Sequence, residues 1–250
     1  RHGVWGVMVF EENFKNEKVL TTLSEKLEII KNLGADYVIS VKPTKDFLGI
    51  DGSDFYKILT GFYKIVKIIA GYDYRFGKGA KYTASDLFDW CERDGVHVHV
   101  ESEYMVNLTP VKSTVIRSHI LSGEIGKANE LLGYRYFLSG VVEKGLGNGQ
   151  KMGFPTANIS FVETKILPPD GVYKGIIRRS DNMEYSALIN IGKNPTFDAE
   201  ERTVEAHIPN FSGDMYNENI RIEFEEKIRD EIRFDSIEAL IGQIKMDISS

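Results

Sequence analysis

The pattern of apolar residues changes character near Gly133, and this change constrains the fold more than any other feature of the chain. Before Gly133, strand-like runs alternate with segments whose apolar residues repeat at helical spacing. That alternation predicts a parallel sheet covered by helices, an α/β domain. After Gly133, short β-rich runs are separated by Gly, Pro, Asn and Asp, which predicts an antiparallel barrel or sandwich. The expected strands are 6–10, 37–41, 65–70 and 96–100 in the first half, and 134–143, 171–178, 185–191, 202–208 and 219–224 in the second.

Local signals place the helices. Thr22 and Glu25 have capping-box spacing at the start of a helix that Gly34 ends. Ser53 is expected to cap the next helix, and the continuous apolar run 65–70 is typical of a strand buried on both faces. Further helices are expected over 83–93, 114–122 and 126–132, and a last one begins at Asp235 and Ser236. The side chains expected to face inward from the helix over 83–93 are Leu87, Phe88 and Cys91.

Composition narrows the class of protein. The chain has 250 residues, 42% of them hydrophobic, and a net charge of −6. That charge argues against a general affinity for nucleic acid or acidic membranes, and no apolar stretch approaches a membrane span. The single cysteine, Cys91, excludes an intrachain disulfide and fits a reducing compartment such as the cytoplasm. Beside Trp90 it is expected to pack rather than react, and His97 and His99 are expected to form a polar strand face.

A glycine-rich segment, GLGNGQKMG at 145–153, is the first candidate for chemistry. Glycines let backbone amides approach an anion closely, and Lys151 adds a positive charge. The segment has neither Walker-loop spacing nor a sound dinucleotide fingerprint, so it is either a phosphate loop or a flexible hairpin loop. Directly behind it, Thr156 and Asn158 offer hard oxygen ligands that suit Mg²⁺ or phosphate, which favours the phosphate loop; the alternative is a turn with an Asn cap.

Seven motifs follow one another in the second half: GFPTANI (153–159), LPPDGVY (167–173), NIGKNPTF (190–197), VEAHI (204–208), GDMY (213–216), RDE (229–231) and FDS (234–236). In order and spacing they resemble the riboflavin kinase family, and GFPTANI looks like the signature of these kinases. The resemblance implies a six-stranded β barrel with ATP and flavin bound at one end.

Residue roles follow from that resemblance. The glycine loop, with Gly145, Gly147, Gly149, Lys151 and Gly153, would bind ATP phosphates. Thr156 and Asn158 would hold Mg²⁺ and phosphate, Arg229 and Phe234 would lie near the flavin, and Glu205 would be the catalytic base, with His207 matching a His that the family commonly has. From the residues alone, Glu205 and His207 share a strand face, which surface strands often show without any catalytic role.

The first half contains the motif GYDYRFGKG at 71–79, and Ser113, Thr114, Ile116 and Arg117 follow Lys112. These residues resemble the FMN adenylyltransferase module of bacterial bifunctional proteins that also carry the kinase, a nucleotidyltransferase-like domain. The motif at 71–79 is the strongest match, and Lys112 replaces a usual Ser of the family's nucleotide motif. Arg75, Ser113, Thr114 and Arg117 would therefore serve an adenylyltransferase nucleotide site. The early segment G-x-F-D-G-x-H-x-G-H of that family is not found in these residues. Either it lies outside this sequence or the adenylyltransferase has decayed.

The sequence therefore predicts an incomplete or degenerate FMN adenylyltransferase-like domain over 1–132 and a riboflavin kinase domain over 133–250. The predicted reaction phosphorylates riboflavin to FMN with ATP as donor and Mg²⁺ as the metal. Two alternatives stay open: a bifunctional enzyme that also adenylylates FMN to FAD, and a non-catalytic flavin-binding module. The presence of Thr156, Asn158 and Glu205 favours an enzyme, because binding alone needs no base.

Overall fold

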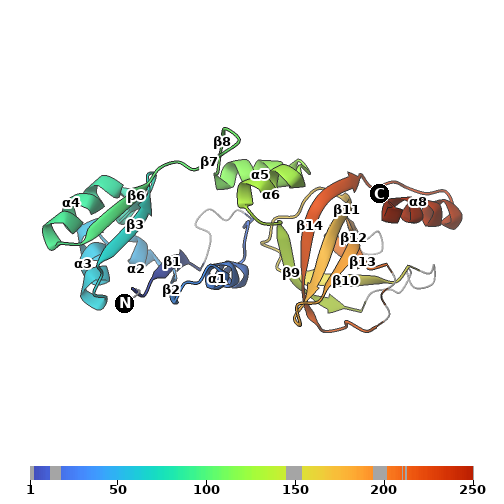
Figure 1. Cartoon of the computed structure of the whole chain (residues 1–250), viewed down its shortest axis with the longest axis horizontal. Coiled ribbons are helices and arrows are strands. Elements are labelled where there is room, and N and C mark those ends of the chain that lie inside the picture. The colour runs from blue at the N-terminus through green and yellow to red at the C-terminus, as the bar shows by residue number, and fades with distance from the viewer. Residues whose placement is uncertain are drawn as a thin grey trace. The chain divides into compact units, whose positions relative to one another are not determined.

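The structure, a computed structural model, describes residues 3–11, 18–144, 154–193, 202–209, 211 and 213–249. Contacts divide the chain into two compact units. The first comprises Arg1–Glu17 and Lys26–Pro110, and the second comprises Lys18–Glu25 and Val111–Ser250. Figure 1 shows the elements of both in chain order by colour. Among the described helices, none has the length and apolarity that a membrane crossing requires.

The first unit is built from short helices and pairs of strands. β1 pairs with β2 and β3 pairs with β6, both in parallel, so the predicted α/β architecture with parallel strands is confirmed. The antiparallel pairs are β4 with β5 and β7 with β8. Its elements are β1 (Gly6–Phe10), most of α1 (Leu23–Asn32), β2 (Tyr37–Val41), α2 (Lys45–Leu48), α3 (Gly52–Phe62), β3 (Lys67–Gly71), β4 (Arg75–Phe76), the 3₁₀ turn η1 (Lys78–Ala80), β5 (Tyr82–Thr83), α4 (Ala84–Asp94), β6 (His97–Glu101), β7 (Met105–Val106) and β8 (Thr109–Pro110).

This unit differs from expectation at three places, two in its core and one at a helix cap. Leu87 and Cys91 of α4 are buried as expected, but Phe88 is 46% exposed. In β3 only Ala70 is buried and Ile69 is 62% exposed, because β3 pairs with β6 alone among the described strands; the expectation of burial on both faces is wrong. The cap of α3 is Asp51, whose carboxylate accepts a hydrogen bond from the Ser53 amide at 3.0 Å, rather than Ser53 itself.

The second unit is a closed six-stranded antiparallel barrel, and the helices described beside it are α5, α6 and α8. The strand order around the barrel is β10-β13-β12-β11-β14-β9, so the barrel alternative is confirmed over the sandwich. Closure leaves no sheet edge in need of cover. The elements are α5 (Ser113–Leu121), α6 (Ile125–Leu132), β9 (Phe137–Glu143), β10 (Thr156–Phe161), β11 (Gly171–Arg179), β12 (Glu184–Lys193), β13 (Arg202–His207), β14 (Asn219–Arg229) and α8 (Ile237–Ser249).

Alternating side chains fill the barrel interior. Ile189, Ile191, Ile222 and Phe224 are fully inaccessible to solvent, and the residues between them face outward. Gly175 permits a close strand approach, since a Cβ there would lie 2.2 Å from the Glu223 carbonyl oxygen. The local pattern did not indicate β10, because Pro155 and Asn158 also suit a turn.

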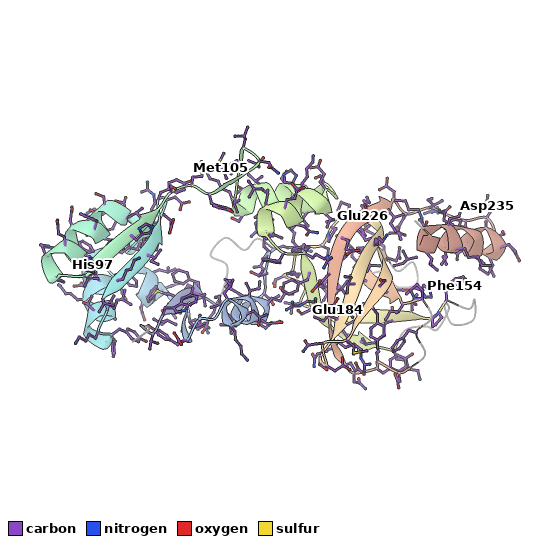
Figure 2. The ribbon with its side chains drawn as sticks, in the orientation of Figure 1. His97, Met105, Phe154, Glu184, Glu226 and Asp235 are labelled. Carbon is purple, nitrogen blue, oxygen red and sulfur yellow. The ribbon has the colours of Figure 1, made fainter. Side chains whose placement is uncertain are left out.

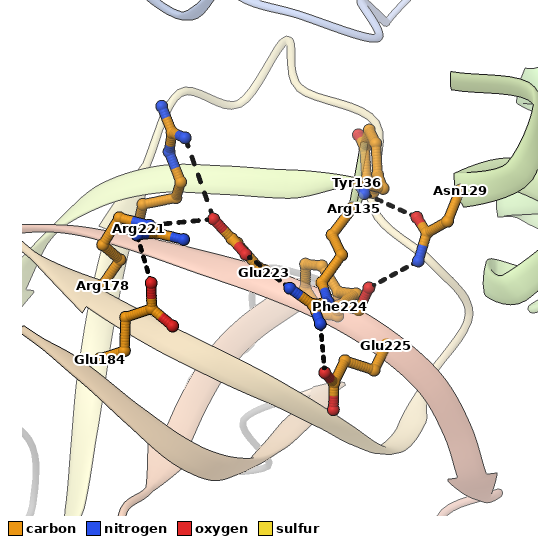
Figure 3. A network of polar contacts seen from close by, with 9 residues as sticks. All are labelled: Asn129, Arg135, Tyr136, Arg178, Glu184, Arg221, Glu223, Phe224 and Glu225. Carbon is orange, nitrogen blue, oxygen red and sulfur yellow. Dashed lines mark hydrogen bonds and ion pairs between the residues drawn. The ribbon is translucent and has the colours of Figure 1, made fainter. Parts of the chain in front are cut away.

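Polar contacts attach α6 to the barrel wall. Asn129 of α6 donates to the Phe224 carbonyl at 2.9 Å and accepts from the Tyr136 amide at 2.6 Å, as Figure 3 shows. Beside it on β14, the carboxylate of Glu223 is 8% exposed and pairs with Arg178 at 3.2 Å and Arg135 at 3.6 Å. A buried carboxylate needs such partners, because leaving water without them is costly.

A buried ion pair joins the segment Lys18–Glu25 to the barrel. Lys165 Nζ lies 2.5 Å from Glu25 Oε2, and both side chains are 1% exposed. Each charge has further partners: Lys165 also donates to the Leu20 carbonyl at 2.6 Å, and Glu25 also accepts from the Ser139 amide at 3.0 Å. The Glu25 carboxylate additionally accepts from the Thr22 amide at 2.8 Å, which confirms the predicted capping box.

We expect Lys165→Met to destabilise the barrel unit by about 3–5 kcal/mol, because it leaves the Glu25 carboxylate buried without its counter-ion. Urea unfolding, followed by far-UV circular dichroism, measures the loss in free energy of unfolding. The matched control is Lys57→Met, whose partner Asp54 forms an exposed pair at 3.2 Å; it should cost less than about 0.5 kcal/mol. Equal losses in the two variants would contradict a special role for the buried pair.

Candidate functional site

A cavity of about 310 Å³ lies between the outer face of the barrel and α8. Figure 2 shows Phe154 and Asp235 on this side of the barrel. Side chains from β10 to β14, from the segment after β14 and from α8 meet there, and most are apolar, as in typical small-molecule sites. The cavity is lined by Phe154, Thr156, Val172, Leu188, Asn190, Glu205, His207, Arg229, Glu231, Ile232, Phe234, Leu240, Ile244 and Asp247.

Strand register places Glu205 at the centre of a polar row. On β13 it lies opposite Asn158 of β10 and opposite Asn190 of β12. Val204 and Ala206, its neighbours along β13, are each 1% exposed and fill the interior. Because side chains alternate along a strand, Glu205 faces outward into the cavity.

Glu205 and Thr156 are in direct contact. The Thr156 hydroxyl donates to Glu205 Oε2 at 3.1 Å. A hydroxyl, a carboxylate and the nearby Asn158 amide supply the hard oxygen donors that Mg²⁺ prefers, so the donor set fits that metal. Asn158 is opposite Glu205 in register but does not line the cavity. Among the described residues, no three His, Cys, Asp or Glu side chains gather in a way that could hold a metal.

His207 connects the cavity to the start of β10. Its Nδ1 lies 2.9 Å from the Pro155 carbonyl oxygen, and since a carbonyl only accepts, Nδ1 carries the proton. The imidazole also meets Phe154 edge-to-face, with ring centroids 5.4 Å apart. His207 therefore fixes the residues immediately before Thr156.

Arg229 of β14 and Phe234 of the segment after it also line the cavity. The Arg229 guanidinium carbon is 5.8 Å from the Phe234 ring centroid, within cation–π range. Arg229 Nη2 donates to Asp247 Oδ2 at 2.8 Å, and the Asp247 side chain is 3% exposed. Asp247 was not predicted from the sequence. A signal was present, since Leu240, Ile244 and Asp247 are spaced by four and three residues and share one helix face.

Glu231 is the cavity residue with an altered pKa. Burial raises the pKa of its carboxyl above the usual value and Asp170 adds to the rise, while Arg202 and Arg229 oppose it. Gly192 lets the carboxylate approach the barrel, because a Cβ at that position would lie 2.0 Å from Glu231 Oε1.

The structure thus brings together four of the predicted site residues: Glu205, Thr156, Arg229 and Phe234. Five others, Gly145, Gly147, Gly149, Lys151 and Gly153, lie outside the described residues. The adenylyltransferase candidates are on two units. Arg75 is in β4 of the first unit, and Ser113, Thr114 and Arg117 are in α5 of the second, where Arg117 donates to the Lys18 carbonyl.

Comparison with known families matches both halves of the chain. The family model for riboflavin kinase matches residues 132–250, and the one for FAD synthetase matches residues 6–115. These ranges correspond to the barrel with α8 and to most of the α/β unit.

Individual relatives cover almost the whole chain. A bifunctional riboflavin kinase/FMN adenylyltransferase of Listeria monocytogenes is 32% identical over 93% of this chain and 74% of its own length. The protein of the same description from Escherichia coli K12 is 30% identical over 96% of this chain and 79% of its own. A crystal structure of a macrolide-efflux protein from Streptococcus pneumoniae superposes with a TM-score of 0.87 at 29% identity, over 98% of this chain and 82% of that one.

We expect Glu231→Gln to make stability less dependent on pH. A carboxyl whose pKa is raised by folding binds more protons in the folded state, so the parent loses stability as pH rises through that pKa, and the uncharged amide does not. The free energy of unfolding of the variant should therefore rise relative to that of the parent between about pH 4 and about pH 7. The rise should stay below about 1 kcal/mol, because the Glu231 carboxyl is partly exposed. Melting temperatures of parent and variant across this pH range measure it. A difference that does not change with pH would show that Glu231 titrates normally.

Proposed function

The chain belongs to the family of bifunctional riboflavin kinases/FMN adenylyltransferases, and on this premise we propose that the cavity under α8 holds the flavin during phosphoryl transfer. The prediction of an enzyme of FMN and FAD biosynthesis, with riboflavin kinase as its main activity and FMN adenylyltransferase as the alternative, is confirmed by this family. Its substrates are ATP and flavins. The observation that carries the assignment of the site is the contact between Glu205 and Thr156 in a mostly apolar cavity.

Glu205 is the proposed general base. Phosphoryl transfer requires a nucleophile positioned in line with the phosphate, and the terminal hydroxyl of the ribityl chain is a weak acid that benefits from a proton acceptor. The carboxylate faces the cavity from strand β13, and the hydroxyl of Thr156 fixes its orientation through Oε2. The base therefore stands ready without reorganisation when the flavin arrives.

Thr156 and Asn158 are the proposed Mg²⁺ and phosphate ligands. Both lie on β10, two residues apart, and offer neutral oxygens beside the Glu205 carboxylate. When bound, Mg²⁺ neutralises charge on the ATP phosphates. The glycines of 145–153 and Lys151 stay a prediction for the phosphate loop, supported by their position in the chain immediately before β10.

The apolar part of the cavity wall is the proposed flavin-ring site. Val172 and Leu188 from the barrel and Leu240 and Ile244 from α8 give this part of the cavity apolar surfaces that suit a flat ring. Phe234 adds an aromatic face, and Arg229 lies against it. The flavin would thus extend from the ring at this wall to its terminal hydroxyl at Glu205.

For the first half, we propose that Arg75, Ser113, Thr114 and Arg117 serve adenylyl transfer to FMN. The support is the match of residues 6–115 to the FAD synthetase family, a range that includes Arg75, Ser113 and Thr114 and ends two residues before Arg117. A functional boundary near Gly133 is supported by the start of the riboflavin kinase match at residue 132. We also propose residence in the cytoplasm, because the single cysteine is a buried free thiol and the relatives are bacterial enzymes.

We expect Glu205→Gln to lower kcat for FMN formation by a factor on the order of 10²–10³, since the nearly isosteric amide cannot accept the proton. The riboflavin KM should change little, because the interaction acts in the transition state. Chromatographic separation of the flavins after incubation with riboflavin, ATP and Mg²⁺ measures the rates. Glu225→Gln, which removes a carboxylate paired with Arg135 outside the cavity, is the control and should leave kcat unchanged. A kcat within a few-fold of the parent would rule out Glu205 as the base.

We expect Thr156→Val to raise the Mg²⁺ concentration needed for half-maximal rate, by roughly tenfold, because it removes one of the proposed oxygen ligands while keeping the shape of the side chain. Rates measured over a Mg²⁺ titration test this. The control is Thr203→Val on β13, whose hydroxyl donates to the Gly192 carbonyl at 3.3 Å outside the cavity lining. An unchanged Mg²⁺ dependence in Thr156→Val, or full activity in excess chelator, would contradict the metal assignment.

A further inference from the structure

Asp247 is a buried carboxylate that has no role in the proposed reaction. It lies near the end of α8, its side chain is 3% exposed, and it lines the cavity. Burying a carboxylate costs free energy unless hydrogen bonds and a counter-ion compensate. On a surface helix such a residue is rare without a specific partner, and here the partner is Arg229.

The contact between the two side chains is extensive. Arg229 Nε donates to Asp247 Oδ2 at 3.0 Å and Oδ1 at 3.2 Å, and Nη2 donates to Oδ2 at 2.8 Å. Gln243 Nε2, one helical turn earlier, donates to Oδ1 at 2.8 Å. This fork geometry fixes the plane of the guanidinium as well as its position.

The pair also closes a loop of the cavity wall. Arg229 ends β14 and Asp247 lies 18 residues later on α8. Between them are Glu231, Ile232, Phe234, Leu240 and Ile244, all of which line the cavity. Joining the two ends therefore holds the wall segment and α8 against the barrel.

The charge of Arg229 is compensated locally. Three of its hydrogen bonds go to Asp247, and Nη1 donates to the Asp230 carbonyl at 3.1 Å. With a carboxylate in contact, the guanidinium is poorly suited to hold an anionic group at this wall. Beside the Phe234 ring it instead suits an uncharged planar ring.

We propose that Asp247 is a positioning residue of the flavin-ring site: it fixes the Arg229 guanidinium beside Phe234 and fastens α8 over the cavity, so that both form a preorganised wall for an uncharged heteroaromatic ring. This inference rests on the proposed function, because it takes the ring to lie at this wall. Preorganisation of a binding wall raises affinity for the ligand without changing the chemical step.

The test compares ring binding with catalysis in Asp247→Asn. The amide keeps the size of the side chain but loses the charge and one acceptor oxygen. Dissociation constants for riboflavin and for lumiflavin, which has the ring without the ribityl chain, are measured by quenching of flavin fluorescence. Both should rise by the same factor, on the order of tenfold, while kcat at saturating riboflavin and the KM for ATP stay within about twofold.

Glu223→Gln is the matched control for stability. Glu223 is a similarly buried carboxylate, 8% exposed and paired with arginines (Figure 3), but it is not among the residues that line the cavity. It should lower the melting temperature and leave both flavin dissociation constants unchanged. Gln243→Met is a milder variant that removes only the helix-side donor, and it should raise both constants by roughly two- to threefold even if Asp247→Asn does not fold.

The outcomes separate the two claims. Unchanged flavin affinities in Asp247→Asn or, if that variant does not fold, in Gln243→Met would overturn the positioning role, as would losses that fall equally on flavin affinity, the KM for ATP and kcat. A rise for riboflavin without one for lumiflavin would also overturn it, because the ring would then lie elsewhere. In each of these cases the assignment of Glu205 as the base remains supported if Glu205→Gln lowers kcat. If Glu205→Gln is fully active while the Asp247 variants weaken flavin binding as expected, only the assignment of the base is contradicted.

Discussion

Closure of the barrel is the constraint on which the site depends. Asn158, Glu205 and Asn190 form one row only because β10, β13 and β12 are held in a single register. A slip of β13 by one residue would turn Glu205 into the interior and bring Val204 or Ala206 to the cavity. The fully buried isoleucines at 189, 191 and 222 make such a slip costly, so packing of the interior determines which side chains line the cavity.

Around this barrel, buried ion pairs attach the peripheral segments. Glu25 with Lys165 holds the segment Lys18–Glu25, and Arg229 with Asp247 holds α8. Such pairs add little net stability compared with apolar residues of similar size, but breaking one is strongly destabilising. They therefore act as specific attachments. Each ion pair requires one partner in one geometry, whereas an apolar contact would tolerate several. In the second pair, Arg229 and Asp247 line the cavity, so this specific geometry fixes part of the cavity wall.

Much of the fold follows from local pattern, and most of the site does not. The β-rich runs alternate clearly because one face of each strand fills the barrel, whereas β10 was missed because Pro155 and Asn158 also suit a turn. The predictions that Phe88 and both faces of β3 are buried were wrong. Burial depends on which elements pack alongside, and the periodicity of apolar residues does not give that information. The roles of Glu205 and Arg229 were assigned from the family resemblance, because no spacing rule joins residues from different strands and the strand face that Glu205 shares with His207 does not indicate catalysis. Asp247 was missed because a carboxylate on a helix usually faces water.

The cavity has two chemically different ends, and this division follows from charge. At one end Glu205 carries its negative charge on a strand, beside the oxygens of Thr156 and Asn158. At the other, the charge of Arg229 is compensated by Asp247 and the surroundings are apolar. A ligand with an uncharged ring and a polar hydroxylated chain matches both ends in one orientation only, because the reverse would place hydroxyls on apolar walls and a ring against a carboxylate. In the proposed site, the orientation of the flavin is thus selected on binding, before phosphoryl transfer. The base then needs to act on one hydroxyl only, the one at the end of the ribityl chain farthest from the ring.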